Sequence, residues 1–223
     1  MEEVPLTIIG GGAVGLACAY ELSDLLGADK VFLLEKHSKV GQEQSGRSSE
    51  VSHSGLYQEG LRARLCVEGN RLLREFCQEQ NVPTIDTGKL IVATNEAEDK
   101  VLDELLQKAA QYNVPGLTKL TSKKEIQQLE PQVEAYSAIY STTTSIIDSA
   151  TYMQRLSALC TGRKAYVLTG REVIDIASQE DGFILKVKTP SHTEQWFTRY
   201  LVNSAGLYSD EIAKMVNPEN KWE

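Results

Sequence analysis

The sequence has no surplus of basic side chains: 23 Lys and Arg residues stand against 31 Asp and Glu residues, for a formal net charge of −8 at pH 7. Surfaces that follow a nucleic-acid backbone concentrate Lys and Arg, so we expect no nucleic-acid partner, and any nucleotide should be a bound cofactor. No apolar run approaches the roughly 20 residues that span a bilayer, so no integral membrane segment is expected. The first residues carry no basic region and no cleavage site, and we expect no secretory or transit peptide.

Cysteine is scarce and lacks the spacing of a metal site. The four cysteines, Cys18, Cys66, Cys77 and Cys160, form no CxxC pair and lie in apolar or helical surroundings. We therefore expect buried, reduced thiols in a cytoplasmic compartment, with no disulfide and no metal ligand among them. A mitochondrial location is the alternative for a eukaryotic source.

Hydrophobic periodicity predicts an α/β protein. A β-rich run at Leu6–Ile9 precedes three glycines, helical spacing follows over Ala13–Leu26, and an apolar strand at Val31–Leu34 ends at Glu35. Strand, glycine turn, helix and strand make a βαβ unit, which implies a parallel sheet covered by helices. Residues 41–60 show no period, and a loop of this length in a compact domain is usually functional or disordered.

Later segments predict further helices and a β-meander. Helical spacing covers Leu61–Gln80 and residues 96 to 112, Lys89–Thr94 is a strand, and Ser122 with Glu125 fits a capping box. From residue 166 short strands follow one another, with Asp181-Gly182 as a hairpin turn. The four strands have the sequences YVLT, EVIDIAS, FILKVKT and WFTRYLVN.

The glycine turn has the spacing of a dinucleotide-binding motif. Gly10 permits a tight turn, Gly12 lets the backbone approach a pyrophosphate, and Gly15 lets helix and strand pack closely. Glu35, at the end of the second strand, suits the ribose hydroxyls and would repel a 2′-phosphate, which disfavours NADP. FAD and NAD are not separated by this motif. A second indication is the strand that ends in Ala205-Gly206, where small residues admit a cofactor.

Five stretches together resemble the L-2-hydroxyglutarate dehydrogenases and oxidases, which belong to the D-amino-acid-oxidase-like group of FAD enzymes. In chain order they are GQEQSGRSSEVSHSGLY, LCVEGNRLLREFCQEQNVP, TGKLIVAT, AIYSTTTSIID and VNSAGLYSDEIA. The resemblance implies FAD as cofactor, a small 2-hydroxy acid as substrate and quinone or oxygen as electron acceptor. It implies a Rossmann-like FAD-binding domain with a parallel sheet and a β-meander, formed by residues 1–82 and 146–223. Residues 83–145 would be an inserted part of an α+β substrate domain.

The expected reaction moves a hydride from the carbinol carbon of the substrate to flavin N5, while a base takes the hydroxyl proton. We predict His53 as that base, since an imidazole accepts a proton near neutral pH; a merely hydrogen-bonded loop histidine is the alternative. Tyr57 and Lys89 are candidates for substrate binding, although an ordinary strand-edge role for Lys89 is favoured. His37 and His192 are expected at the surface.

Thirteen residues are expected to contact the cofactor. Arg47 and Ser48 are predicted to hold the pyrophosphate or the substrate carboxylate, and a solvated loop arginine is equally compatible with the sequence. The full set is Gly10, Gly12, Ala13, Val14, Gly15, Glu35, Lys36, Arg47, Ser48, Ser49, Val173, Ala205 and Gly206.

The chain departs from the family pattern, GRNSGVIHAGIYY, around the histidine. Ser48 replaces an asparagine, Glu50 a glycine and Ser52 an isoleucine. A carboxylate at position 50 would repel a dianionic substrate. Family members are also longer, so we expect this chain to lack the rest of the substrate domain and the last flavin-contacting glycine loop. Apolar surface left uncovered there predicts self-association or a partner chain.

Two other functions stay open at this point. An amino-acid oxidase of the same fold would place an amine where the hydroxyl lies. A fragment or subunit that binds FAD without turnover is the second alternative.

Overall fold

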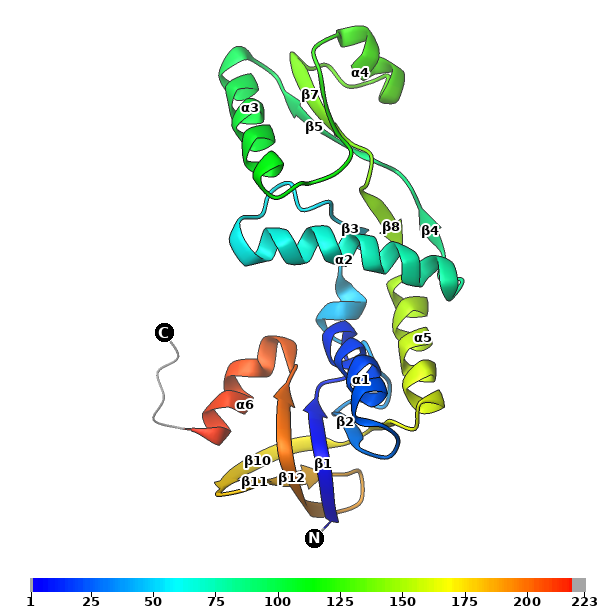
Figure 1. Ribbon diagram of the computed structural model, residues 1–223, viewed down its shortest axis with the longest axis vertical. Helices are drawn as coiled ribbons and strands as arrows, with labels where there is room; N and C mark the ends of the chain where they lie inside the picture. Colours follow the sequence, from blue (N-terminus) through cyan, green and yellow to red (C-terminus); the bar gives the residue numbers. More distant parts are fainter. Residues whose placement is uncertain (1, 218–223) are drawn as a thin grey trace. The chain divides into compact units, whose positions relative to one another are not determined.

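The computed structural model describes residues 2–217 of the 223-residue chain, and they form two compact units (Figure 1). The first unit consists of Met1–Ser48 and Ser149–Glu223, and the second is Ser49–Asp148. These boundaries differ from those predicted for the two domains, because residues 49–82 and 146–148 cluster with the second unit. Residues 218–223 lie outside the described part of the chain.

The first unit is built on a six-stranded sheet. Strands β12, β1, β2 and β9 are parallel neighbours, and the pairs β10–β11 and β11–β12 at the other edge are antiparallel. Successive side chains of a strand point to opposite faces, so the burial of four consecutive residues at Leu6–Ile9 shows that both faces of β1 are covered. In sheet order the strands are β10 (Glu172–Gln179), β11 (Gly182–Lys188), β12 (Thr193–Asn203), β1 (Glu2–Ile9), β2 (Val31–Glu35) and β9 (Tyr166–Thr169).

Strand β12 joins the meander to the parallel part of the sheet. Its first half pairs antiparallel with β11, and residues 196–203 pair parallel with β1, ending at the pair Ile9↔Asn203. The βαβ unit predicted from the sequence is therefore confirmed. Of the four strands predicted for the β-meander, β10, β11 and β12 form it within the same sheet, whereas β9 pairs parallel with β2 at the other edge.

Three helices pack on this sheet. Helix α1 (Ala13–Leu26) packs on β1 and β2, α5 (Ser149–Gly162) packs on α1 and β9, and α6 (Ser209–Val216) packs on β10 and β12. The core beneath α6 is formed by side chains from the strands and from the helix itself. Its buried members are Val4, Ile9, Leu34, Val173, Ile176, Leu185, Val187, Trp196 and Ile212.

The second unit contains two three-stranded antiparallel sheets and three helices. Helix α2 runs along the small sheet β3-β8-β4, while α3 and α4 accompany the sheet β5-β7-β6 (Figure 1). The strands are β3 (Val51–Ser52), β8 (Ser145–Ile147), β4 (Thr84–Ile85), β5 (Lys89–Ala93), β7 (Ser137–Ser141) and β6 (Leu117–Leu120). The helices are α2 (Gly60–Glu79), α3 (Glu96–Gln111) and α4 (Lys123–Leu129); short 3-10 turns, η1 (Gln44–Arg47) and η2 (Gly206–Tyr208), belong to the first unit.

Two local predictions need correction. The pair Gln179↔Gly182 makes Glu180 and Asp181 the turn of the β10–β11 hairpin, one residue earlier than predicted. Gly182 lies in the strand instead, where a Cβ would come within 2.3 Å of the Thr198 carbonyl oxygen. Ser122 occupies the N-cap position of α4 as predicted, but in the described structure its hydroxyl makes no capping hydrogen bond.

The four cysteines are free thiols, but only two of them are buried as predicted. Burial raises the pKa of the Cys160 thiol to about 11. Cys18 and Cys66 are partly exposed. Within residues 2–217 no cluster of His, Cys, Asp and Glu side chains is suited to hold a metal ion.

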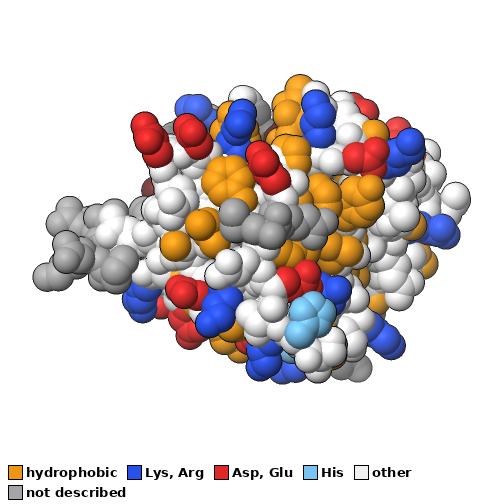
Figure 2. Space-filling model, turned by 90° about the horizontal axis from the view of Figure 1, so that it is seen from below, with side chains coloured by type: hydrophobic (Ala, Val, Ile, Leu, Met, Phe, Trp, Pro, Cys, Tyr) orange, Lys and Arg blue, Asp and Glu red, His pale blue; other side chains and the backbone are white. Residues whose placement is uncertain are grey.

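The molecular surface mixes charges of both signs. On the face drawn in Figure 2, hydrophobic side chains reach the surface between acidic and basic ones. In the first unit the most exposed large apolar side chains are Leu25, at 79%, and Leu207, at 72%. None of the helices that the structure describes is long and apolar enough to cross a membrane.

Glu50 has a left-handed backbone conformation, with φ of 60°, at the position where the family pattern has glycine. This conformation costs a residue with a Cβ roughly 1–2 kcal/mol. We expect Glu50→Gly to be more stable than Glu50→Ala by about 1 kcal/mol, as measured by urea unfolding.

The matched control is Glu68, which lies inside helix α2. There the order should reverse, with Glu68→Ala more stable than Glu68→Gly by about 1 kcal/mol. An alanine variant at position 50 that equals or exceeds the glycine variant would contradict the assigned backbone strain.

Candidate functional site

The glycine turn brings three backbone segments into close contact. A Cβ on Gly15 would lie 1.9 Å from the carbonyl oxygen of Gly10, and a Cβ on Gly10 would lie 2.5 Å from that of Ser204. Gly10 also has φ of 108°, a conformation that favours glycine. The Ser204 hydroxyl donates hydrogen bonds to the carbonyls of Ile9, at 2.8 Å, and Gly10, at 3.2 Å. The ends of β1 and β12 are thereby held together beside the turn.

Glu35 is fixed by the backbone on both sides of its carboxylate. The Gly11 N–H donates to Oε2 at 2.7 Å and the His37 N–H donates to Oε1 at 2.8 Å. The residue is 7% exposed and is the last residue of β2. Each carboxylate oxygen has a second lone pair, so the group can still accept a bond from a ligand hydroxyl.

The N-terminus of helix α1 lies at the same cleft as Glu35. Gly12 is the N-cap and makes no side-chain cap bond, and the first turn holds no acidic residue. The Ser45 hydroxyl accepts the Ala13 N–H at 3.0 Å, and a Cβ on Gly12 would lie 2.9 Å from this hydroxyl. A helix N-terminus without an acidic side chain in its first turn favours an anionic group such as a phosphate.

These features surround a cleft of about 390 Å³ in the first unit. Eight of the thirteen predicted cofactor residues line it: Gly10, Gly12, Val14, Glu35, Lys36, Val173, Ala205 and Gly206. Gly15 packs directly against the Gly10 carbonyl of the turn, and the Ala13 N–H donates to the Ser45 hydroxyl. The structure therefore brings together residues from β1, β2, β10 and the end of β12.

Three predicted cofactor residues lie elsewhere. Arg47, Ser48 and Ser49 are exposed, and none of them is among the described residues that line the cleft. They sit at the boundary between the two units. Their assignment to the cofactor stays a prediction.

Glu43 and Tyr208 line the cleft but were not predicted from the sequence. Both contact the predicted Lys36, whose Nζ lies 3.5 Å from the Tyr208 ring centroid and 3.5 Å from Glu43 Oε1. Glu43 also contacts His37 Nε2 at 2.8 Å, and this bond lowers the pKa of the Glu43 carboxyl. His37 thus has a carboxylate partner that the sequence did not predict. Ser45 and Glu43 belong to the aperiodic loop, which was the only signal for them.

The second unit has a smaller cavity of about 110 Å³. It gathers the predicted base and both predicted substrate residues, His53, Tyr57 and Lys89. Lys89 Nζ lies 4.7 Å from the centroid of the Tyr57 ring. This lysine, for which an ordinary strand-edge role was favoured, therefore also lines the cavity. Other lining residues are Ser54, Gly55, Leu56, Gln58, Cys66, Ile91, Ser141 and Thr144.

His53 is one of the residues that line this cavity. Although the residue is exposed, partial burial of the ring lowers its pKa from the usual 6.5, and the nearby Lys89 charge lowers it further. The imidazole is therefore neutral at pH 7 and can accept a proton. Glu50 is not among the described residues that line this cavity. His192 is exposed, as predicted, and its ring lies 2.9 Å from the Ser191 hydroxyl.

A parallel sheet with a glycine turn, a helix N-terminus and an acidic residue at the end of the second strand defines a dinucleotide-binding protein of the α/β class. Residues 6–222 match the DAO family model, described as FAD dependent oxidoreductase. The chain belongs to this family.

Known proteins similar to this chain include dehydrogenases and an oxidase. It is 35% identical to an L-2-hydroxyglutarate dehydrogenase of Indibacter alkaliphilus, over 98% of this chain and 54% of that protein. It is also 35% identical to the human mitochondrial L-2-hydroxyglutarate dehydrogenase, over 94% of this chain and 47% of that protein. The chain thus spans about half the length of these curated relatives.

Among solved structures, the dithionite-reduced L-α-glycerophosphate oxidase of Mycoplasma pneumoniae with FAD bound superposes with a TM-score of 0.86 and 32% identity. The alignment covers 97% of this chain and 57% of that one. The predicted fold class is confirmed. The comparisons give no support to the partner chain expected from the sequence.

The cleft of the first unit fits FAD, the cofactor of the family. The glycines of the turn and the absence of an acidic side chain in the first turn of α1 suit a pyrophosphate, beside which the Ser45 hydroxyl would lie, and the Glu35 carboxylate suits a ribose hydroxyl. The cleft volume of about 390 Å³ falls in the usual range for cofactor sites.

We expect Glu35→Ala to weaken FAD binding by roughly 1–3 kcal/mol, which corresponds to about 5- to 150-fold in the dissociation constant. The substitution removes the acceptor for the ribose and frees the Gly11 and His37 N–H groups. The measurement is a fluorescence titration of FAD with the apoprotein.

Glu172→Gln is the matched control, since Glu172 is an acid that lines the same cleft from β10. It should bind FAD as the parent chain does. An unchanged dissociation constant in Glu35→Ala would remove this residue from the cofactor site.

Proposed function

We propose that this protein is an FAD-dependent oxidoreductase that converts a small 2-hydroxy acid, L-2-hydroxyglutarate, to its 2-oxo acid. The observation that carries the proposal is the single cavity that joins His53, Tyr57 and Lys89. A neutral imidazole and a fixed cation are the two groups that the oxidation of an anionic alcohol requires from the protein. The identity of about 35% to L-2-hydroxyglutarate dehydrogenases supports the choice of substrate.

The cleft of the first unit would hold the cofactor. Glu35 would accept the ribose hydroxyls, and the turn at Gly10–Gly12 with the N-terminus of α1 would hold the pyrophosphate. Val173, Ala205 and Gly206 would contact the remaining parts. When bound, FAD supplies the acceptor for the substrate hydride.

The residues of the smaller cavity divide the remaining tasks. Lys89, whose ammonium group lies near the face of the Tyr57 ring, attracts a substrate carboxylate into the cavity. His53 accepts the hydroxyl proton on its unprotonated ring nitrogen, because its lowered pKa keeps the ring neutral near pH 7. The Lys89 cation and the His53 base would also accept other 2-hydroxy acids of similar size. A dicarboxylate would be attracted most strongly by the cation.

The proposal also includes an external electron acceptor, a quinone or oxygen, and a reducing compartment such as the cytoplasm. The four free thiols support such a compartment.

The catalytic assignment predicts that His53→Ala keeps FAD bound but lowers substrate-dependent flavin reduction by about 10²–10⁴-fold, the usual effect of a positioned acid or base. Stopped-flow absorbance with L-2-hydroxyglutarate measures the rate. His192→Ala, which changes the exposed histidine of the other unit, should reduce at the parent rate. Near-normal reduction in His53→Ala would assign the proton to water or to another group, and loss of flavin would make His53 a structural residue.

The direction of the His53 pKa shift predicts the pH profile. The base is active when neutral, and its pKa lies below 6.5, so the reduction rate should be level above about pH 7 and fall as the pH drops through the lowered pKa. His53→Ala should lack this inflection. A parent rate that rises as pH falls would contradict a neutral imidazole base.

A further inference from the structure

Asn70 is a polar residue on the buried side of helix α2. The buried residues of this helix are Ala63, Asn70 and Cys77, which follow one another at intervals of seven and so lie along one side of the helix. The Asn70 side chain is buried, at 7% exposure. An amide in such a row has to find hydrogen-bond partners, since an unpaired buried polar group costs about 1–3 kcal/mol.

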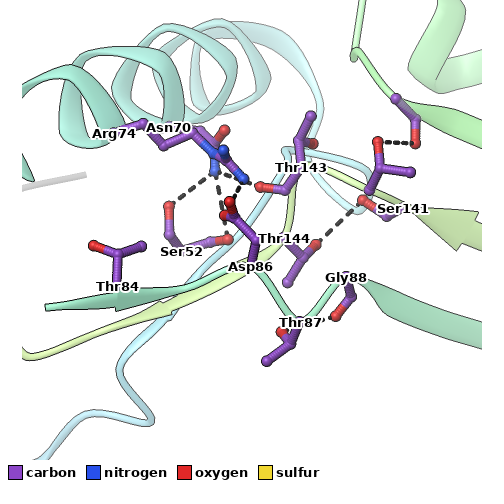
Figure 3. Close-up of polar contacts among 12 residues, drawn as sticks. Ser52, Asn70, Arg74, Thr84, Asp86, Thr87, Gly88, Ser141, Thr143 and Thr144 are labelled. Atoms are coloured by element: carbon purple, nitrogen blue, oxygen red, sulfur yellow. Dashed lines mark hydrogen bonds and ion pairs between the residues drawn. The ribbon is translucent and has the colours of Figure 1, made fainter. Parts of the chain in front are cut away.

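The partners of the Asn70 amide come from two separate segments of the chain (Figure 3). Nδ2 donates to the Ser52 hydroxyl at 2.8 Å, to the Thr143 carbonyl at 3.2 Å and to the Ser52 carbonyl at 3.4 Å. Ser52 ends β3, and Thr143 lies just before β8. One side chain of α2 therefore ties together two segments that are far apart in the sequence.

In both segments the next residue along the chain lines the smaller cavity. His53 follows Ser52, Thr144 follows Thr143, and both line the cavity. In the β3–β8 ladder Ser52 pairs with Ser145, so continuing the antiparallel register would place His53 opposite Thr144. The Asn70 bonds are thus made at the point where the two strands leave their sheet and enter the cavity wall.

The same network continues to the cation of the cavity. The Thr144 carbonyl accepts the Gly88 N–H at 3.0 Å, and the Thr144 and Ser141 hydroxyls lie 3.2 Å apart. Gly88 precedes Lys89, and Ser141 pairs with Lys89 between β7 and β5. Hydrogen bonds and strand pairing therefore link the Asn70 amide to both the histidine and the lysine of the cavity.

We propose that Asn70 is a positioning residue, which holds His53 at the cavity by fixing Ser52 and Thr143 with a single buried amide. It does not itself line the cavity. Its significance for catalysis rests on the proposed role of His53, but its structural effect can be measured without FAD or substrate.

The test uses the imidazole of His53 as the probe. The titratable groups that line the cavity with it are Lys89 from β5, Cys66 from α2 and Tyr57 from its own loop. Partial burial and the Lys89 charge hold the pKa of His53 below 6.5. A loosened His53 gains contact with water and moves away from the lysine, so its pKa should rise.

We expect Asn70→Ala to raise the pKa of His53 by roughly half a unit or more, toward its usual value, in an NMR titration of the imidazole signals of the full chain. The signals of His37 and His192 should titrate as in the parent chain and so act as internal references. The sequence contains three histidines, which keeps the assignment simple.

Asn95→Ala is the matched control. It also removes an asparagine amide from the second unit, where Asn95 caps α3 by accepting the Glu98 N–H at 3.0 Å. This variant should be less stable than the parent chain, because the helix loses its cap, without any change in the His53 pKa. If both variants lose stability but only Asn70→Ala raises the His53 pKa, the change reflects the position of His53 and not a general loosening of the second unit.

If Asn70→Ala does not fold, Ser52→Ala gives the same comparison, because it removes only the 2.8 Å acceptor. We expect a smaller rise of the His53 pKa in that variant. A His53 pKa that equals the parent value in the folded variant, or a rise of the same size in Asn95→Ala, would overturn the proposal. A failed His53→Ala rate test, in contrast, would remove the catalytic role and leave this titration result unaffected.

Discussion

A Cβ atom at Gly15 would lie 1.9 Å from the carbonyl oxygen of Gly10, and one at Gly10 would lie 2.5 Å from the carbonyl oxygen of Ser204. No side chain larger than hydrogen fits where the turn after β1, the start of α1 and the end of β12 meet. This contact sets the position of the α1 N-terminus relative to the sheet. The remaining features of the cleft depend on it, because the bond between the Gly11 N–H and Glu35 forms only if the turn lies against the end of β2. The position of the α1 N-terminus and that of the buried Glu35 carboxylate therefore both depend on one packing constraint.

Much of the first unit could be predicted, because its information is local. Residues 13–26 show helical spacing directly after the glycines, and α1 has these bounds. The domain boundary could not be found in this way. Periodicity identifies α2 as a helix, but its packing depends on bonds such as that from Asn70 to Thr143, 73 positions along the chain. A helix pattern does not state which sheet the helix covers. Likewise, the glycine of the Asp181-Gly182 pair predicts a turn, whereas the structure uses Gly182 for close strand contact.

The candidate site was predictable where backbone chemistry demands one residue type. Gly10, Gly12 and Glu35 line the cleft because a turn, a close approach and a hydroxyl acceptor leave few substitutes. Ser45, Glu43 and Tyr208 also lie at the cleft, but serine, glutamate and tyrosine occur at many surface positions and carry no such demand. Asn70 had a detectable signal, since a polar residue interrupts a row of small apolar ones on α2. That signal shows that a partner exists, and only the fold identifies Ser52 and Thr143 as the partners.

Strand β12 takes part in two ladders with different tolerance for change. The β10–β11 and β11–β12 connections lie at opposite ends of β11, and both lie outside residues 196–203, so a longer loop at either connection leaves the register of these residues against β1 untouched. An extra residue within 199–203, by contrast, would turn every following side chain to the opposite face. Ser204 would then lose its bonds to the Ile9 and Gly10 carbonyls, and the bond holding the cofactor turn to this strand would be lost. Length variation among natural relatives should therefore collect in the loops of the meander and be absent from the last residues of this strand.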